Sequence, residues 1–484
     1  MLFVFALLFL SCAVQSQRGT LTFPAIIALI FSIFFLVCAF ALYRPIQQKN
    51  DSQADERVLK VALYHTNTYS WLLKLAVLFH LVLFAWDYRP MWFVAVLIGC
   101  AVLLDKPKFG FMPQNENISP VFSHWLRKRP WFVLTLYALV CLTYITTDTF
   151  FYKNIDVYHF QHDGVRALLQ GTNPYTLRPL SIYPPNTSFY APELVKDGVL
   201  QFGYPYLPLT LLMAVPGVLL GDVRFALFAS MGLAGWLLMR TGDSARPCSR
   251  SENMDTPSPR TSSTRCSQIA VLSGSLLLLF PHFLYFLVNA WNDVLVVMFF
   301  CLVVLCAVRK SPWLPVAVGL WLASKQYVVL LLPLIVLLLP MQSPPNEKKR
   351  FYLGAIGTAL IVSLPMILWN VREFAWSALQ LQFYQPLRDE ALSLLVAVKL
   401  STGVILPMWI PFIALIGATV WALRIAPRTV HGFCASCTLV FFVFIALNKQ
   451  AFLNYYFVVF AMLCCTLATF CNDASPSESD SEQA

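Results

Sequence analysis

Ionisable and aromatic residues gather between residues 154 and 208, in a stretch that has no apolar run of membrane length. At its start, polar residues recur at spacings of three or four, at Asp156, His159, Asp163, Arg166 and Gln170. This period predicts an amphipathic helix that lies along a membrane surface. A carboxylate on such a polar face can act as a general base, because it can accept a proton from a hydroxyl within hydrogen-bond reach.

Two histidines in this stretch raise the question of a metal site. His159 and His162 lie near Asp156 and Asp163, and carboxylates and imidazoles both bind divalent ions. Their spacing, however, matches no standard metal-binding signature. Cys434 and Cys437 form a CxxC pair, but they lie in an apolar run and lack the second pair that a zinc site needs. A divalent metal stays open but is not indicated, so we expect no metal and no other cofactor.

Four further polar groups interrupt the apolar part of the chain. They are Asn292-Asp293, Lys325-Gln326, Arg388-Asp389, and the group Asn448, Lys449, Gln450, Asn454, Tyr455 and Tyr456. An ionisable group at membrane depth costs roughly 2.5 to 3.5 kcal/mol, so each needs a partner, a watery cavity or a route to the interface. The alternative for Lys325, Arg388 and Lys449 is a side chain that only anchors a helix end. Tyr455 and Tyr456 could instead belong to an interfacial aromatic belt.

Composition places these groups in a membrane protein. Of the 484 residues, 58% are hydrophobic and only 12% are charged, which is typical of polytopic membrane proteins. The net charge of +10 is spread over linkers without a basic stripe, so nucleic acid is not an expected partner. Most cysteines lie in apolar runs and residues 154–208 contain none, which argues against a disulfide framework.

Apolar segments fill most of the chain. They cover residues 1–14, 21–43, 69–86, 90–104, 131–147, 206–220, 223–239, 269–288, 291–308, 314–323, 327–339, 351–369, 405–423, 433–447 and 455–471. Several are shorter than the roughly 20 residues of a perpendicular span, which is typical of broken or tilted helices in a bundle. We therefore expect an all-α polytopic membrane protein with about 13 to 15 transmembrane helices.

Basic linkers set the expected topology. Residues 44–60 and 106–129 are rich in Lys and Arg, so both should be cytoplasmic and residues 148–205 should be extracytoplasmic. Residues 240–268 are expected to form a flexible polar loop whose arginines favour the cytoplasm, although two spans after residue 205 would place it outside. Either one of these two segments does not cross or the loop breaks the charge rule. We expect an outer surface helix at 391–402 and a disordered acidic tail at 472–484.

Short motifs in the stretch 154–208 and beyond carry a family resemblance. They are Asp156-Val157-Tyr158, Ala167-Leu168-Leu169, Gly171, Asn173-Pro174-Tyr175, Tyr204-Pro205, Leu207-Pro208, Asn292-Asp293, and residues 319–325 and 388–393. In order and spacing they resemble GT-C fold glycosyltransferases that use polyprenyl-phosphate sugars, and the group they match best is the mannosyltransferase-like family 87 of the DUF2029 type. The similar region covers roughly residues 131 to 470. Residues 1–130 are then expected to be additional transmembrane helices and linkers before a catalytic domain at 131–471.

The resemblance implies a hexosyltransferase that passes several times through the cell membrane. It would move a hexose or pentose, mannose-like in the first place, from a polyprenyl-phosphate donor to a lipid or glycan acceptor at the extracytoplasmic face, among membrane lipids. It implies Asp156 as general base, with Asp163 and Asp148 as alternatives. Substrate-binding roles are expected for Lys325, Arg388, Lys449, Asn292, Asp293, Tyr175, Tyr204, His159 and Tyr456. The three cations would stabilise the charge of the leaving phosphate.

Two other functions stay open. A lipid or sugar transporter or flippase also uses buried charges and broken helices. Against it, no repeat relates the two halves, and the charges lie at the ends of apolar segments. An oligosaccharide polymerase or ligase would be favoured by a large loop late in the chain, whereas here the large loop comes early.

Overall fold

The structure is a computed structural model that describes residues 1–15, 20–42, 71–83, 120–145, 155–184, 187, 189–244 and 259–470. Within these ranges the fold is all-α, and the only strands are the short antiparallel pair β1 (Val195–Lys196) and β2 (Val199–Leu200). Among the described residues, three helical stretches are long and apolar enough to cross a membrane, at Phe23–Ala41, Arg224–Asp243 and Pro345–Trp369, and several shorter apolar helices accompany them.

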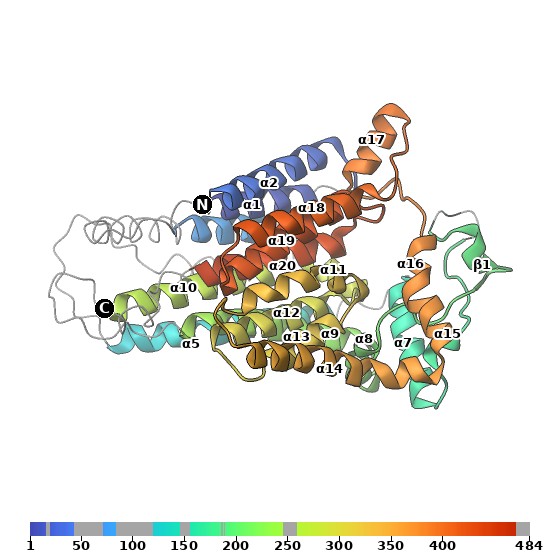
Figure 1. Cartoon of the computed structure of the whole chain (residues 1–484), viewed down its shortest axis with the longest axis horizontal. Coiled ribbons are helices and arrows are strands. Elements are labelled where there is room, and N and C mark those ends of the chain that lie inside the picture. The colour runs from blue at the N-terminus through green and yellow to red at the C-terminus, as the bar shows by residue number, and fades with distance from the viewer. Residues whose placement is uncertain are drawn as a thin grey trace.

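Apolar helices form a bundle that makes up the body of the molecule (Figure 1). They are α1 (Leu2–Gln15), α2 (Phe23–Ala41), α5 (Pro120–Ile145), α9 (Arg224–Met239), α10 (Pro259–Leu278), α12 (Asp293–Val308), α13 (Leu314–Leu322), η6 (Gln326–Leu338), α14 (Pro345–Trp369), α18 (Ile410–Ile425), α19 (Val430–Ala446) and α20 (Leu453–Thr469). Helices α12, α19 and α20 are buried on nearly every side, whereas α14 buries only Phe351, Ala355 and Met366. A helix that is apolar all round needs either protein or lipid on every face.

Shorter elements gather at one end of the bundle, which we call the cap, at the right of Figure 1. The cap consists of α7 (Asp156–Leu169), η3 (Pro174–Thr176), η4 (Pro192–Leu194), β1, β2, α15 (Val371–Phe374), the π-helical turn η7 (Ala375–Gln380) and α16 (Leu381–Tyr384). The amphipathic helix predicted from Asp156 is confirmed as α7. Its buried face includes Tyr158, Phe160 and Val165, which join the core of the molecule.

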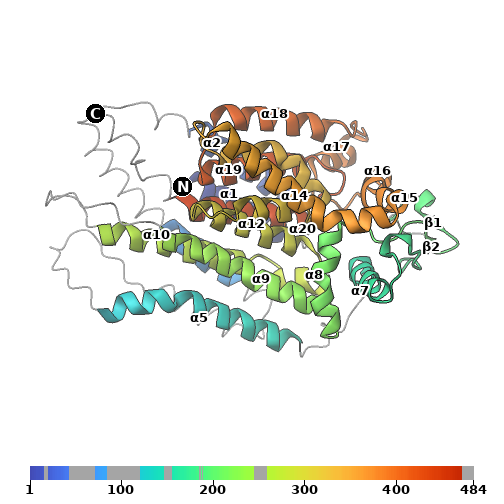
Figure 2. The same cartoon turned by 60° about the horizontal axis from the view of Figure 1, so that its bottom comes forward.

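Helix α8 (Pro208–Leu219) bears on the conflict over the arginine-rich loop. Figure 2 shows α8 lying across the end of the bundle, steeply inclined to α9. Only α9 therefore runs along the bundle between the cap and Arg240, which lies toward the opposite end, where η5 (Arg240–Ser244) packs against α20. Of the two alternatives that the sequence left open, this course favours the one in which the segment 206–220 does not run parallel to 223–239, because a 12-residue apolar helix can also cover the end of a bundle.

Three further predictions are corrected or refined. The single segment at 269–288 is divided into α10 and α11 (Phe283–Val288) around His282, whose φ of 60° breaks the helix. Helix α10 begins at Pro259, so the last ten residues of the loop predicted to be flexible at 240–268 are helical. The outer helix predicted at 391–402 is found as α17 (Leu394–Thr402), which Ser393 caps at its start and Gly403 ends with a φ of 74°.

The first helices are part of the bundle. Helix α1 packs against α2 and α20, and Leu21, just before α2, bonds through its backbone N–H to Glu390 O, before α17, at 3.1 Å. In the helix Trp71–Leu83, the ring of His80 bonds Ser11 Oγ at 2.8 Å and is fully buried. The expected segment at 90–104, the tail at 472–484 and Asp148 lie outside the described residues.

Candidate functional site

Asp156 opens helix α7, where a carboxylate is favoured by the helix dipole. Its Oδ2 accepts a hydrogen bond of 2.5 Å from the Tyr190 hydroxyl, and its backbone N–H donates to the Tyr183 hydroxyl at 3.4 Å. Burial raises the pKa of Asp156 above its usual value, and the hydrogen bond from Tyr190 and the charge of Arg388 oppose this rise only in part. Asp156 is therefore a half-buried carboxyl of increased basicity.

Arg388 lies close enough to act on Asp156. Its guanidinium stacks over the rings of Phe189 and Phe452, with 4.3 and 5.1 Å to their centroids. It also donates two hydrogen bonds, of 2.6 and 3.1 Å, to one carboxylate oxygen of Glu390, and these bonds lower the pKa of Glu390. A cation fixed by two aromatic faces and an exposed carboxylate has a defined position beside the candidate base.

Asp293, the first residue of α12, is fully buried and accepts three side-chain hydrogen bonds. Its Oδ1 accepts from Lys325 Nζ at 2.8 Å and from the Tyr327 hydroxyl at 2.6 Å, and its Oδ2 accepts from Asn454 Nδ2 at 3.0 Å. The donors come from the N-cap and first turn of η6 and from α20. Buried ion pairs need such additional bonds, because both charges lose their hydration.

Tyrosine rings surround the ammonium group of Lys325. It lies 5.3 Å from the ring centroid of Tyr206, 5.5 Å from Tyr327 and 5.8 Å from Tyr455. Tyr206 precedes α8, and its pKa is raised by burial and further by the charges of both Asp156 and Asp293. Tyr206 is therefore within electrostatic range of both carboxylates, and it links the residues around Asp156 to those around Asp293. We call the combined set the polar cluster. It consists of Asp156, Asp293, Lys325, Arg388 and Asn454 with Tyr183, Tyr190, Tyr206, Tyr327 and Tyr455.

Three tyrosines expected to bind substrate lie in the interior. Tyr175 is fully buried, donates through its hydroxyl to Tyr206 O at 2.9 Å and packs edge-on against Tyr204. Tyr204 is likewise buried, and Tyr456 donates to Leu392 O inside the bundle. These rings hold the loop and the bundle together, whereas their contact with a substrate stays a prediction.

The remaining expected residues divide between the cluster and its surroundings. Asn292 is 1% exposed next to Asp293, and neither polar atom of its amide has a hydrogen-bond partner among the described residues, which suits a ligand hydroxyl. Lys449 Nζ donates to Phe383 O at 3.2 Å and Gln385 O at 2.6 Å, so this ammonium group binds backbone carbonyls at the end of α16. Asp163 is about half exposed and bonds His162 at 2.9 Å, and His159 packs edge-on against Tyr158.

Several cluster residues were missed from the sequence. Tyr190, Tyr206 and Tyr327 carry no signal of their own, because tyrosine is common in membrane-interface loops. A fully buried ion pair was missed as well: Arg224 donates to both carboxylate oxygens of Asp222 at 2.9 and 2.7 Å and lies under the Tyr158 ring of α7. The sequence did contain a signal for this pair, because Asp222 and Arg224 are opposite charges placed where two apolar segments meet.

Comparisons with protein-family models, with curated proteins and with solved structures found no match for this chain. The resemblance to GT-C glycosyltransferases thus remains an expectation from short motifs. The function has to be inferred from the polar cluster itself.

Lys325→Met should lower stability by roughly 3 to 5 kcal/mol, because it leaves Asp293 as an uncompensated buried charge. The thermal unfolding midpoint of the detergent-solubilised protein measures this loss. Lys399→Met is the matched control: Lys399 pairs with Asp389 at 2.5 Å on the surface, and its loss should cost less than about 1 kcal/mol. The double variant Asp293→Asn/Lys325→Met should regain part of the stability. Equal midpoints for Lys325→Met and Lys399→Met would contradict the buried pair.

Proposed function

We propose that the chain crosses a cell membrane several times and that the cap lies on the extracytoplasmic side. Helix α12 begins at Asp293 in the polar cluster, so Arg309 and Lys310, which follow its end, lie at the opposite end of the bundle. Helix α14 ends beside α15 in the cap, so residues 348–350, all basic, lie away from the cap as well. Arg240 lies toward the same end. Basic residues concentrate on cytoplasmic sides, which supports the proposed orientation.

A pair of cysteine variants tests this topology. Lys196→Cys, in the β1–β2 hairpin of the cap, should react with an impermeant thiol reagent applied to intact cells. Lys349→Cys, at the start of α14, should react only after the membrane is permeabilised. Both residues are exposed, and both variants need a background without reactive native cysteines. The reverse pattern of labelling would refute the orientation.

We further propose that the polar cluster transfers a sugar from a polyprenyl-phosphate donor to a lipid or glycan hydroxyl. The observation that supports this most is the half-buried carboxyl of Asp156, whose pKa is raised, beside the fixed guanidinium of Arg388. In the reaction, the acceptor oxygen forms a bond to the anomeric carbon as the bond from that carbon to the phosphate oxygen breaks. The acceptor proton passes to Asp156, and the bonding electrons leave with the polyprenyl phosphate.

The cations of the cluster have unequal roles in this proposal. Lys325 is held by Asp293, so that pair presents little net charge and mainly positions the tyrosine rings. Arg388 is paired with the exposed Glu390, and such a surface pair is weak enough to be exchanged for a phosphate. The guanidinium fork matches phosphate geometry. Arg388 is therefore the preferred phosphate ligand, and the Asn292 amide is the candidate partner of a sugar hydroxyl.

Asp156→Asn should reduce turnover roughly 100- to 10,000-fold while donor binding is retained, because the amide keeps the shape of the side chain but cannot accept a proton. The assay uses purified protein with a panel of polyprenyl-phosphate sugars and measures the polyprenyl phosphate released. Asp163→Asn is the matched control on the same helix and should change turnover little. A transporter would lose binding and transport together in Asp156→Asn, and its wild type would release no polyprenyl phosphate.

The pH dependence should report the Asp156 carboxyl. Its base form is lost as pH falls through its raised pKa, so transfer should decline on the acid side. Tyr190→Phe removes a hydrogen bond that stabilises the carboxylate, so it should raise the pKa further and move the acid limb of kcat/KM to higher pH. Tyr352→Phe, on α14 and outside the cluster, should leave the limb in place. A shift to lower pH in Tyr190→Phe would exclude Asp156 as the titrating base.

A further inference from the structure

The segment formed by α15, η7 and α16 has two unlike faces. One face is buried in the molecule, with Phe374, Ala378 and Leu381. The other exposes large apolar side chains to their surroundings, at Val371, Leu379 and Phe383, and Phe383 is 77% exposed. An amphipathic segment with such an unpartnered apolar face needs a second apolar surface.

The exposed face continues the exposed face of α14. Helix α14 is one of the three helices long and apolar enough to cross a membrane, and it leaves Ile361 75% exposed and Leu368 and Trp369 exposed near its end. At Asn370 the chain turns, and the Asn370 side chain accepts a bond from Glu373 N that caps α15. Figure 1 shows the segment from α15 to α16 rising crosswise to α14 at the end of the bundle. A helix crosswise to a spanning helix lies in the plane of the membrane surface.

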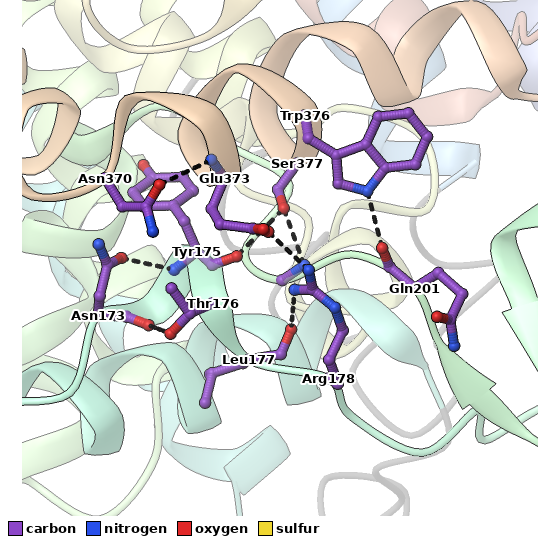
Figure 3. Close-up of polar contacts among 11 residues, drawn as sticks. Asn173, Tyr175, Thr176, Leu177, Arg178, Gln201, Asn370, Glu373, Trp376 and Ser377 are labelled. Carbon is purple, nitrogen blue, oxygen red and sulfur yellow. Dashed lines mark hydrogen bonds and ion pairs between the residues drawn. The ribbon is translucent and has the colours of Figure 1, made fainter.

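The opposite side of the segment bonds to the part of the chain between α7 and α8, which we call the cap loop, through contacts that we call the latch (Figure 3). Glu373 Oε2 pairs with Arg178 at 2.6 Å, and Trp376 Nε1 donates to Gln201 O at 2.7 Å. Ser377 Oγ accepts from Gly203 N at 2.9 Å and donates to Tyr175 O at 3.3 Å.

The loop is closely packed where the latch contacts it. At Gly203, an added Cβ would lie 2.3 Å from Tyr175 O, so the two pieces of loop meet where only glycine fits. The Tyr175 hydroxyl in turn donates to Tyr206 O, beside the Lys325 ammonium. A π-helical turn such as η7, which carries Trp376 and Ser377, is rare and frequently found at functional sites. The position of the segment is thereby coupled to that of the polar cluster.

We propose that α15–η7–α16 is a membrane-surface segment whose partner is the lipid bilayer on the cap side. Val371, Leu379 and Phe383 enter the boundary between headgroups and acyl chains, and the exposed Arg372 faces lipid phosphates. Through the latch, this contact fixes the height of the cap loop, and with it the polar cluster, above the bilayer. The inference rests on the proposed membrane insertion of α14 and is independent of the proposed sugar transfer.

Lipid is favoured over a protein partner by continuity. The exposed apolar side chains run from the middle of α14 to the end of α16 without a charged residue other than Arg372 and the latch residue Glu373. A second copy of the chain or another protein at this face would also have to cover the end of α14, where a spanning helix contacts lipid.

Fluorescence quenching tests the inference on the full chain in phosphatidylcholine vesicles. A bimane label is placed at Phe383→Cys, at Ile361→Cys on α14 and at Lys196→Cys in the hairpin, each in a background without reactive native cysteines. Quenchers are brominated acyl chains in the lipid and iodide in the water. We expect strong quenching by shallowly brominated lipid at Phe383, by deeply brominated lipid at Ile361, and by iodide alone at Lys196.

Each other result overturns the inference in a recognisable way. Quenching at Phe383 by iodide alone, with Ile361 still quenched by lipid, would mean that α14 is in the bilayer but the segment is in water. Protection of Phe383 from both quenchers would indicate a protein partner. Absence of lipid quenching at Ile361 would refute the membrane insertion of α14 itself. None of these results depends on turnover, so they are separate from failure of the transferase proposal.

Discussion

The buried pair of Asp293 and Lys325 constrains the rest of the structure. Removing two charges from water is costly, and this cost is offset only while Asp293 keeps its bonds from Lys325, Tyr327 and Asn454. Those bonds require α12, η6 and α20 to present their ends at one height. A slip of one helix by a single turn, about 5.4 Å, would break them. The polar cluster therefore exists because this register is fixed.

The sequence predicted helices well and their directions poorly. Segments such as α12, α19 and α20 were located within about three residues, because each is a long apolar run bounded by polar groups. The crosswise course of α8 was not predictable, because the same 12 apolar residues suit the end or the side of a bundle. Segment α15–η7–α16 was missed because its π-helical turn disrupts the 3.6-residue period. The break at His282 was missed because the apolar run continues through it.

The candidate site was predictable in its charges and not in its neutral partners. Asp293, Lys325 and Arg388 were recognised because an ionisable residue among apolar segments is costly and needs a partner or a polar cavity. The pairing of Asp293 with Lys325 was not foreseen, since 32 residues separate them. The surroundings of the tyrosines were not predicted: Tyr175, expected to bind substrate, is buried, and Tyr190, which bonds Asp156, had no signal in the sequence. Whether a tyrosine side chain is buried in the core or donates a hydrogen bond to a site residue depends on the fold around it.

Thr20 and Leu21, just before α2, pair with Ala391 and Glu390, three and two residues after Arg388, and α1 packs on α20. Contacts between such distant parts of a chain form late, because a long loop must close first. During synthesis, α1, Thr20 and Leu21 are made more than 300 residues before Glu390, Ala391 and α20, which they contact in the folded chain. Arg388 can therefore reach its final position only when nearly the whole chain has been translated. The polar cluster is therefore complete only once the helices that follow Arg388 are in place, among them α20, which supplies Asn454.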